Sequence, residues 1–132
     1  MATFKRFEEI IAWQLAHQLC REIGRIARET GLAKDYKLRE QVCDSSNSIM
    51  NNIAEGFGRT GNREFIGFLH IAHASCSETQ SQLYTLHDRK YITPEEFDVL
   101  NLLAHRTSKA IYSLIGYLER SEIRGLRYRS RG

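Results

Sequence analysis

Apolar residues recur every three or four positions along most of this chain, which is the spacing of one face of an α-helix. The pattern is interrupted at Gly31, at Gly56 and Gly58, and again around Pro94, the one proline in the chain. No segment alternates apolar and polar residues as a half-buried strand would. The pattern predicts four helices, over residues 7–30, 36–57, 62–89 and 94 to about 120.

The predicted helix ends carry recognisable signals. Asn62 is expected to cap the third helix, and Thr93-Pro94-Glu95-Glu96 forms a capping box with proline in the first turn. Gly56 and Gly58 are interpreted as the residues that stop the second helix. Long helices joined by connections of a few residues must pack against their chain neighbours. The sequence therefore predicts an all-α fold, an antiparallel up-down-up-down four-helix bundle.

The last helix is apolar around more than one face. Its off-stripe apolar residues are Val99, Leu102, Leu103, Ala110, Leu114 and Tyr117. Apolar area beyond one stripe, together with Trp13 on the first helix, favours packing against a second copy of the chain. A wide seam inside the bundle is the alternative.

The overall composition fits one ordinary globular domain of 132 residues. No apolar run approaches the roughly 20 residues that cross a bilayer, and the first residues do not lead into a signal segment. We therefore expect a cytoplasmic protein with no membrane partner. Cys20, Cys43 and Cys76 are odd in number and widely spaced, which favours buried free thiols over disulfides or a zinc ribbon.

The net charge of +3 is concentrated at the C-terminus. Residues 121–132 contain four arginines against Glu122, so the other 120 residues balance 15 basic with 15 acidic side chains. We divide the chain into a bundle over residues 1–120 and a basic, disordered tail over residues 121–132. The tail suits nucleic-acid phosphates, although a solubilising end is the alternative. The arginines assigned to this surface are Arg120, Arg124, Arg127, Arg129 and Arg131.

Polar residues follow the apolar stripes of the second and third helices at helical spacing. They are Ser48, Asn51, Asn52, Glu55, Ser75, Glu78 and Gln82. One interpretation is a buried hydrogen-bond network that fixes how the helices align, with Glu55 also paired to Arg59. The other is a ligand or RNA site in which Asn51 and Asn52 act with Arg59 and Arg63.

Catalytic and metal sites find less support. Glu55 and Glu64 could act as paired carboxylates, but they flank a turn with no nucleophile nearby. His70, His73 and Cys76 have an inviting spacing, yet steps of three residues drift around a helix and no fourth ligand is evident. We therefore expect no catalytic residue, no metal and no cofactor.

One stretch carries a resemblance to a known family. Ser48-Ile-Met-Asn-Asn-Ile-Ala-Glu-Gly-Phe-Gly-Arg59, followed by Glu64-Phe-Ile-Gly-Phe-Leu69, resembles the four-helix bundle family of 23S rRNA-intervening-sequence proteins. Phe7-Glu-Glu-Ile-Ile-Ala-Trp13 is similar to the opening of that family. Arg89-Lys90 departs from it, because members often have Leu-Gly there, and the arginine tail lies outside the pattern.

The resemblance implies a ring of bundles, a pentamer, with no established enzymatic activity. The family takes its name from reading frames inside insertions in 23S rRNA genes. It is also similar to the accessory variability determinant proteins of diversity-generating retroelements, basic pentameric bundles that engage a reverse transcriptase and nucleic acid. We therefore predict a non-enzymatic oligomer that binds structured RNA or a ribonucleoprotein. The alternative is a scaffold that docks another polypeptide and no nucleic acid.

Overall fold

The computed structural model describes the backbone of residues 4–131 and the side chains of residues 4–121. This range holds four α-helices, two short 3-10 helices and no strand. In chain order they are η1 Phe7–Glu9, α1 Ile11–Glu29, η2 Gly31–Lys34, α2 Tyr36–Phe57, α3 Asn62–Asp88 and α4 Pro94–Arg131. The prediction of an all-α fold with four helices is confirmed, although the first helix begins four residues later than expected.

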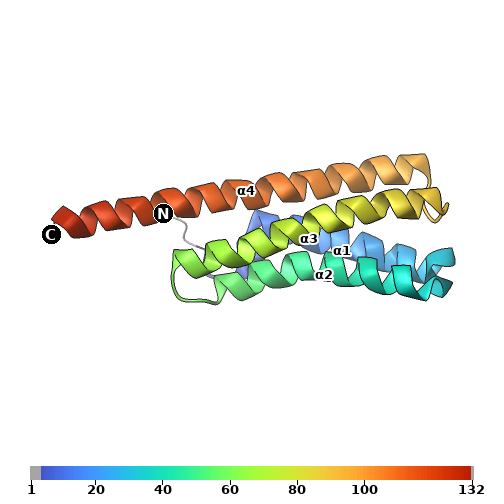
Figure 1. Ribbon diagram of the computed structural model, residues 1–132, viewed down its shortest axis with the longest axis horizontal. Coiled ribbons are helices and arrows are strands. Elements are labelled where there is room, and N and C mark those ends of the chain that lie inside the picture. Colours follow the sequence, from blue (N-terminus) through green and yellow to red (C-terminus); the bar gives the residue numbers. More distant parts are fainter. Residues whose placement is uncertain (1–3, 132) are drawn as a thin grey trace.

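Consecutive helices lie side by side, with the α1–α2 and α3–α4 connections at one end and the α2–α3 turn at the other (Figure 1). Hydrogen bonds between α2 and α3 join Ser45 to Thr79 and Ser48 to Ser75. Residue numbers therefore rise along α2 as they fall along α3. Hydrogen bonds between α3 and α4 join Asn62 to Leu118 and Cys76 to Ala104, so residue numbers also rise along α3 as they fall along α4.

The apolar stripes of all four helices meet in one core. Its large side chains with no exposed surface are Leu19, Ile23, Ile26, Leu32, Val42, Ile49, Ile53, Leu69, Leu83, Leu86 and Ile111. Burial of this apolar surface is the main favourable contribution to folding. None of the helices within residues 4–131 has the length and hydropathy that a bilayer-spanning segment requires.

The turn between α2 and α3 differs in part from its prediction. α2 continues through Gly56 to Phe57, so Gly56 does not stop it, whereas Gly58 is the residue at which α2 ends, in a right-handed conformation with φ −76°. Gly61, with φ 94°, is the residue that needs glycine. It occupies the position before α3, while Asn62 is the first helical residue and caps nothing with its side chain. The predicted Asn62 cap is therefore wrong.

The α3–α4 connection is closed at both ends. The capping box is confirmed, since the Thr93 amide donates to Glu96 Oε1 at 2.9 Å and the Glu96 amide donates to Thr93 Oγ1 at 3.1 Å. On the other side, Lys90 has a left-handed backbone with φ 62°. Lys90 occupies the position where the family resemblance leads one to expect glycine.

The C-terminal part of α4 also differs from expectation. We expected the helical pattern to fade near residue 120, whereas α4 continues to Arg131 and extends beyond the other helices at the end of the α2–α3 turn (Figure 1). Residues in this stretch other than Gly125 are compatible with a helix, and no proline stops it. The boundary at residue 120 and the disorder expected for residues 121–132 both remain predictions.

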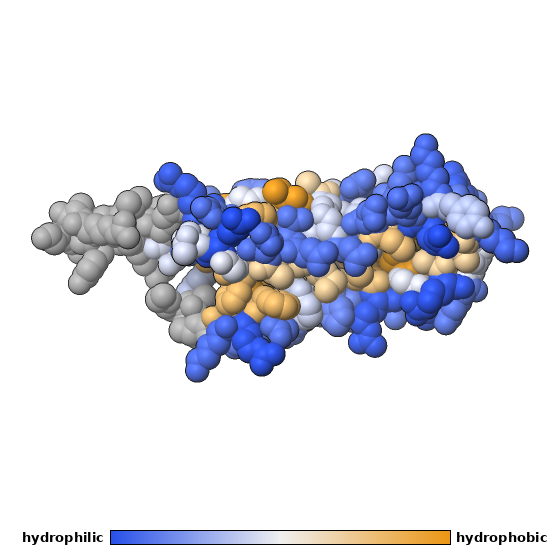
Figure 2. Space-filling view, turned by 90° about the horizontal axis from the view of Figure 1, so that it is seen from below, coloured by the Kyte–Doolittle hydropathy of each residue, from blue (hydrophilic) through white to orange (hydrophobic). Residues whose placement is uncertain are grey.

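The second apolar face of α4 divides into three parts. Leu103 and Leu114 are buried, and Ala110 and Tyr117 pack at the edge of the core. Val99 and Leu102 remain exposed, at 66% and 59%. Figure 2 views the bundle from below, the side away from α4, and there apolar residues show as a narrow strip between hydrophilic ones. Of the six residues predicted to form this second face, four thus widen the internal seam, and Val99 and Leu102 are left for a partner.

Candidate nucleic-acid interface

Two groups of arginines that are far apart in the sequence share one end of the bundle. Arg59 and Arg63 flank the α2–α3 turn, and Arg120 follows the part of α4 that reaches the same end (Figure 1). The link is direct, because the Asn62 side-chain amide donates to the Leu118 carbonyl at 3.4 Å. Arg59, Arg63 and Arg120 are all exposed. Arg124, Arg127, Arg129 and Arg131 lie further along α4, where side chains fall outside the described residues.

Arg59 is held in place by two contacts. Its guanidinium donates to Glu55 Oε1 at 2.7 Å, which is the predicted pairing across one helical turn. The same group lies over the Phe68 ring, 5.1 Å from the ring centre. Glu55 therefore offsets much of the charge that Arg59 brings to this surface, while about half of the Arg59 side chain stays accessible.

The polar rows on α2 and α3 meet at the helix seam. Ser48 and Ser75 share a hydrogen bond of 2.8 Å between their hydroxyl groups. The Asn52 side-chain amide donates to the Ser48 carbonyl at 2.8 Å and to the Ser48 hydroxyl at 3.0 Å. Gln82 accepts a hydrogen bond from Ser45. Four of the seven polar candidates, Ser48, Asn52, Ser75 and Gln82, thus take part in one seam network.

The other three polar candidates, Asn51, Glu55 and Glu78, are exposed and lie outside this network. Its most buried members are two residues that sequence reasoning missed, Ser45 and Thr79, whose hydroxyl oxygens are 2.9 Å apart. Among the described side chains, no buried nitrogen or oxygen lacks a hydrogen-bond partner. The seam is therefore satisfied from within, which favours the structural interpretation over a ligand site.

His70, His73 and Cys76 on α3 differ in how deeply they are buried and in which groups they contact. His70 is exposed, whereas His73 Nε2 lies 2.9 Å from the Ser108 hydroxyl. Cys76 is fully buried and donates to the Ala104 carbonyl, and burial raises its pKa to about 11. Within the described part of the chain, no three histidine, cysteine or acidic residues are grouped as metal ligands would be.

All three cysteines are free thiols. Cys76 is buried as expected, but Cys20 and Cys43 are only partly buried. Cys20 donates a hydrogen bond of 2.9 Å to Asn47 Oδ1. Partial burial raises the pKa of both Cys20 and Cys43, since a thiolate loses hydration there.

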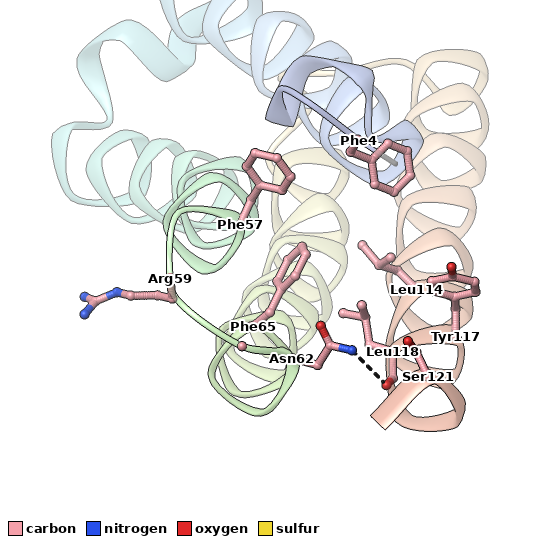
Figure 3. A pocket seen from close by; sticks show the side chains of 10 residues that line it. Phe4, Phe57, Arg59, Asn62, Phe65, Leu114, Tyr117, Leu118 and Ser121 are labelled. Carbon is pink, nitrogen blue, oxygen red and sulfur yellow. Dashed lines mark hydrogen bonds between the residues drawn. The ribbon is translucent and has the colours of Figure 1, made fainter. Parts of the chain in front are cut away.

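A pocket of about 200 Å³ opens at the arginine-bearing end of the bundle (Figure 3). Phe57 and Phe65 line one side and Leu114 and Leu118 another, with Phe4 across the opening. Its remaining lining residues are Arg59, Gly61, Asn62, Tyr117 and Ser121. Sequence reasoning missed this pocket because it is formed by four segments that only the fold brings together.

The family model for 23S rRNA-intervening sequence proteins matches residues 8–127 of the chain. The chain belongs to this family. In this member of the 23S rRNA-intervening sequence proteins, the match covers α1, α2 and α3 and follows α4 as far as Arg127, so that Arg124 and Arg127 lie within it. Our expectation that the arginine-rich end lies outside the family pattern was therefore wrong for these two residues. The similarity to retroelement accessory proteins remains a prediction.

A solved structure gives the same fold for this family member. It is a protein of unknown function from the S23 ribosomal protein family of Bacteroides thetaiotaomicron, 24% identical to this chain. The similarity covers 80% of this chain and 96% of that one, with a TM-score of 0.73. No curated protein matches the chain.

Proposed function

We propose that this chain is a non-enzymatic RNA-binding bundle whose target is structured RNA, or a ribonucleoprotein, related to ribosomal RNA. The observation that supports this most is the position of its arginines, since the α2–α3 turn and the C-terminal part of α4 lie at the same end (Figure 1). Guanidinium groups are well suited to phosphate oxygens. The proposed contacts are Arg59, Arg63, Arg120, Arg124, Arg127, Arg129 and Arg131.

Self-association is the second part of the proposal. A pentameric ring is what the family resemblance implies, and the exposure of Val99 and Leu102 on α4 supports a contact between copies. In a ring, every copy would add the four arginines of residues 121–132 to one assembly. Weak phosphate contacts would then act together, because binding at one site raises the effective concentration at the next.

The test is a titration of a labelled 23S rRNA hairpin, followed by fluorescence anisotropy at about 50 and 200 mM salt. The test variant changes Arg124, Arg127, Arg129 and Arg131 to glutamine. The matched control changes four exposed basic residues at the opposite end to glutamine, namely Arg28, Lys34, Lys37 and Lys90. Both variants lose four positive charges, so only the position of the charge differs.

We expect the test variant to bind at least tenfold more weakly at the lower salt concentration, and the control to bind nearly as the natural chain does. The salt dependence of the natural chain should have a slope of about −0.7 to −0.9 per contacted phosphate, and the test variant should lose part of it. Equal weakening in both variants would mean that only net charge matters. Absence of binding by the natural chain would contradict the proposal.

The competing function is a scaffold that docks another polypeptide. The exposure of the apolar side chains of Val99 and Leu102 favours it. Apolar docking would respond little to salt, because it releases no counterions. In that case, changing Val99 and Leu102 to glutamine would abolish partner binding, while the arginine variants would leave it intact.

A further inference from the structure

The pocket at the arginine-bearing end is small and largely aromatic. Its volume of about 200 Å³ is below the roughly 300–1,000 Å³ of sites for drug-sized ligands, so it suits a single flat ring system. The rings of Phe57 and Phe65 stand edge to face with their centres 6.2 Å apart. Phe4, Phe57 and Tyr117 line the pocket and are only partly buried. Aromatic side chains that stay partly accessible can serve as surfaces on which nucleic-acid bases stack.

Asn62 supplies a polar group at the floor of the pocket. Its Nδ2 group donates to the Leu118 carbonyl, which fixes the orientation of the amide. Figure 3 shows the Asn62 carbonyl oxygen directed into the pocket rather than toward α4. An amide oxygen in this position can accept a hydrogen bond from the N–H groups that every base carries on its pairing edge.

The charged groups lie outside the pocket. The Arg59 side chain leaves the rim and points away from the cavity (Figure 3). Arg120 adjoins the rim residue Ser121 and is exposed. The apolar walls suit the base of a nucleotide, and the guanidinium groups outside the pocket suit its phosphate. A lipid chain or an apolar peptide side chain carries no negative charge that could bind to the arginines.

We propose that this pocket takes up one unpaired nucleobase of the bound RNA, stacked on the phenylalanines and held at its pairing edge by Asn62. The inference rests on the proposed RNA-binding function and adds the kind of RNA recognised, which is a duplex with a bulged or looped-out base. A fully paired stem presents no such base, because its pairing edges are occupied.

The experiment compares two hairpins that differ at one position, one with a bulged adenosine and one with an abasic residue at the bulge. Ser121→Trp fills the pocket from its rim, and Ser77→Trp on the exposed side of α3 is the matched control. Circular dichroism melting checks that both variants fold. Binding is measured by anisotropy with the full-length chain.

We expect the natural chain and Ser77→Trp to bind the bulged adenosine roughly five- to 150-fold more tightly than the abasic hairpin, which is the range for one stacked base. Ser121→Trp should bind both hairpins equally, at the affinity of the abasic one. Equal binding of both hairpins by the natural chain would overturn the pocket inference and leave the RNA-binding function standing. No binding of either hairpin would instead reject the function and the inference together.

A second measurement does not depend on RNA affinity. Adenosine 5′-monophosphate is titrated at millimolar concentration against the full-length chain, and the ring resonances of Phe57 and Phe65 are followed by NMR. Saturable shifts that Ser121→Trp removes are expected. If Ser121→Trp changes the oligomeric mass and the nucleotide causes no shift, the pocket is a contact between copies and the inference is wrong.

Discussion

Among the residues that the structure describes, Lys90 is the one non-glycine residue with a left-handed backbone. α3 ends in a Schellman motif, in which the Tyr91 amide donates to the Leu86 carbonyl at 2.9 Å and the Lys90 amide donates to the His87 carbonyl at 3.0 Å. The motif requires a left-handed residue at the Lys90 position, and φ there is 62°. Glycine adopts this conformation without steric cost, which explains the glycine in the family pattern.

Lys90→Gly should therefore stabilise the chain, by about 0.5–1 kcal/mol, because relief of the strained backbone outweighs the added freedom of the unfolded state. Urea unfolding measures the difference in the free energy of unfolding. Lys90→Ala removes the same charge but keeps a Cβ, so it should bring no such gain. A stabilisation shared by both variants would assign the effect to charge and contradict the backbone explanation.

At the scale of elements, Gly56 determines how closely α2 approaches α3. A Cβ at this position would lie 2.7 Å from the Phe68 Cβ and 2.9 Å from the Phe65 ring. The Phe68 Cβ is anchored to the backbone and cannot rotate away, so the helices would have to separate. Gly67 and Gly116 differ from Gly56, because no atom lies within 4 Å of a Cβ built on Gly67 and a Cβ on Gly116 meets only the Arg120 side chain.

Gly56→Ala and Gly67→Ala should consequently change stability in opposite directions. Gly56→Ala should lower the free energy of unfolding by about 1–3 kcal/mol, because overpacking exceeds the gain in helix propensity. Gly67→Ala should raise it by up to about 1 kcal/mol, since alanine favours the helix and meets nothing. Thermal and urea unfolding of the two variants provide the comparison, and destabilisation in both would show that Gly67 also has a neighbour.

Apolar spacing and capping residues were enough to predict the helices, whereas contacts between residues far apart in the chain could not be predicted. The limits of α2 and the Thr93 capping box depend on residues within one turn of each other, so both were predictable. Asn62 resembled a cap by residue type, but its partner is Leu118, on a helix that begins 32 residues further along. The pocket and the Ser45–Thr79 bond likewise depend on packing between helices.

At the scale of the whole molecule, two surfaces of different character lie apart. The arginines and the aromatic pocket share the end that holds the α2–α3 turn, whereas Val99 and Leu102 lie in the part of α4 near the opposite end (Figure 1). Assembly through one surface therefore leaves the other accessible. A ring that joins its copies through Val99 and Leu102 could present all its arginine-bearing ends to one RNA.

Val99→Gln combined with Leu102→Gln should reduce the mass of the assembly without unfolding the bundle, because both side chains are already exposed in the single chain. Light scattering coupled to size exclusion measures the mass, and circular dichroism measures the helix content. Tyr36→Gln, at a residue with 66% exposure on another helix, is the control and should leave the mass unchanged. A single-chain mass for the natural protein, or an unchanged mass for the double variant, would contradict assembly through this surface.

The buried thiol of Cys76 can report how often the core of the bundle opens. It is enclosed between α3 and α4, bonded to the Ala104 carbonyl, and its pKa of about 11 leaves almost no thiolate near neutral pH. Thiolate is the form that reacts with alkylating reagents. An alkylating reagent would therefore react with Cys76 only in molecules in which α3 and α4 have separated. The rate of labelling would measure how frequently the core opens.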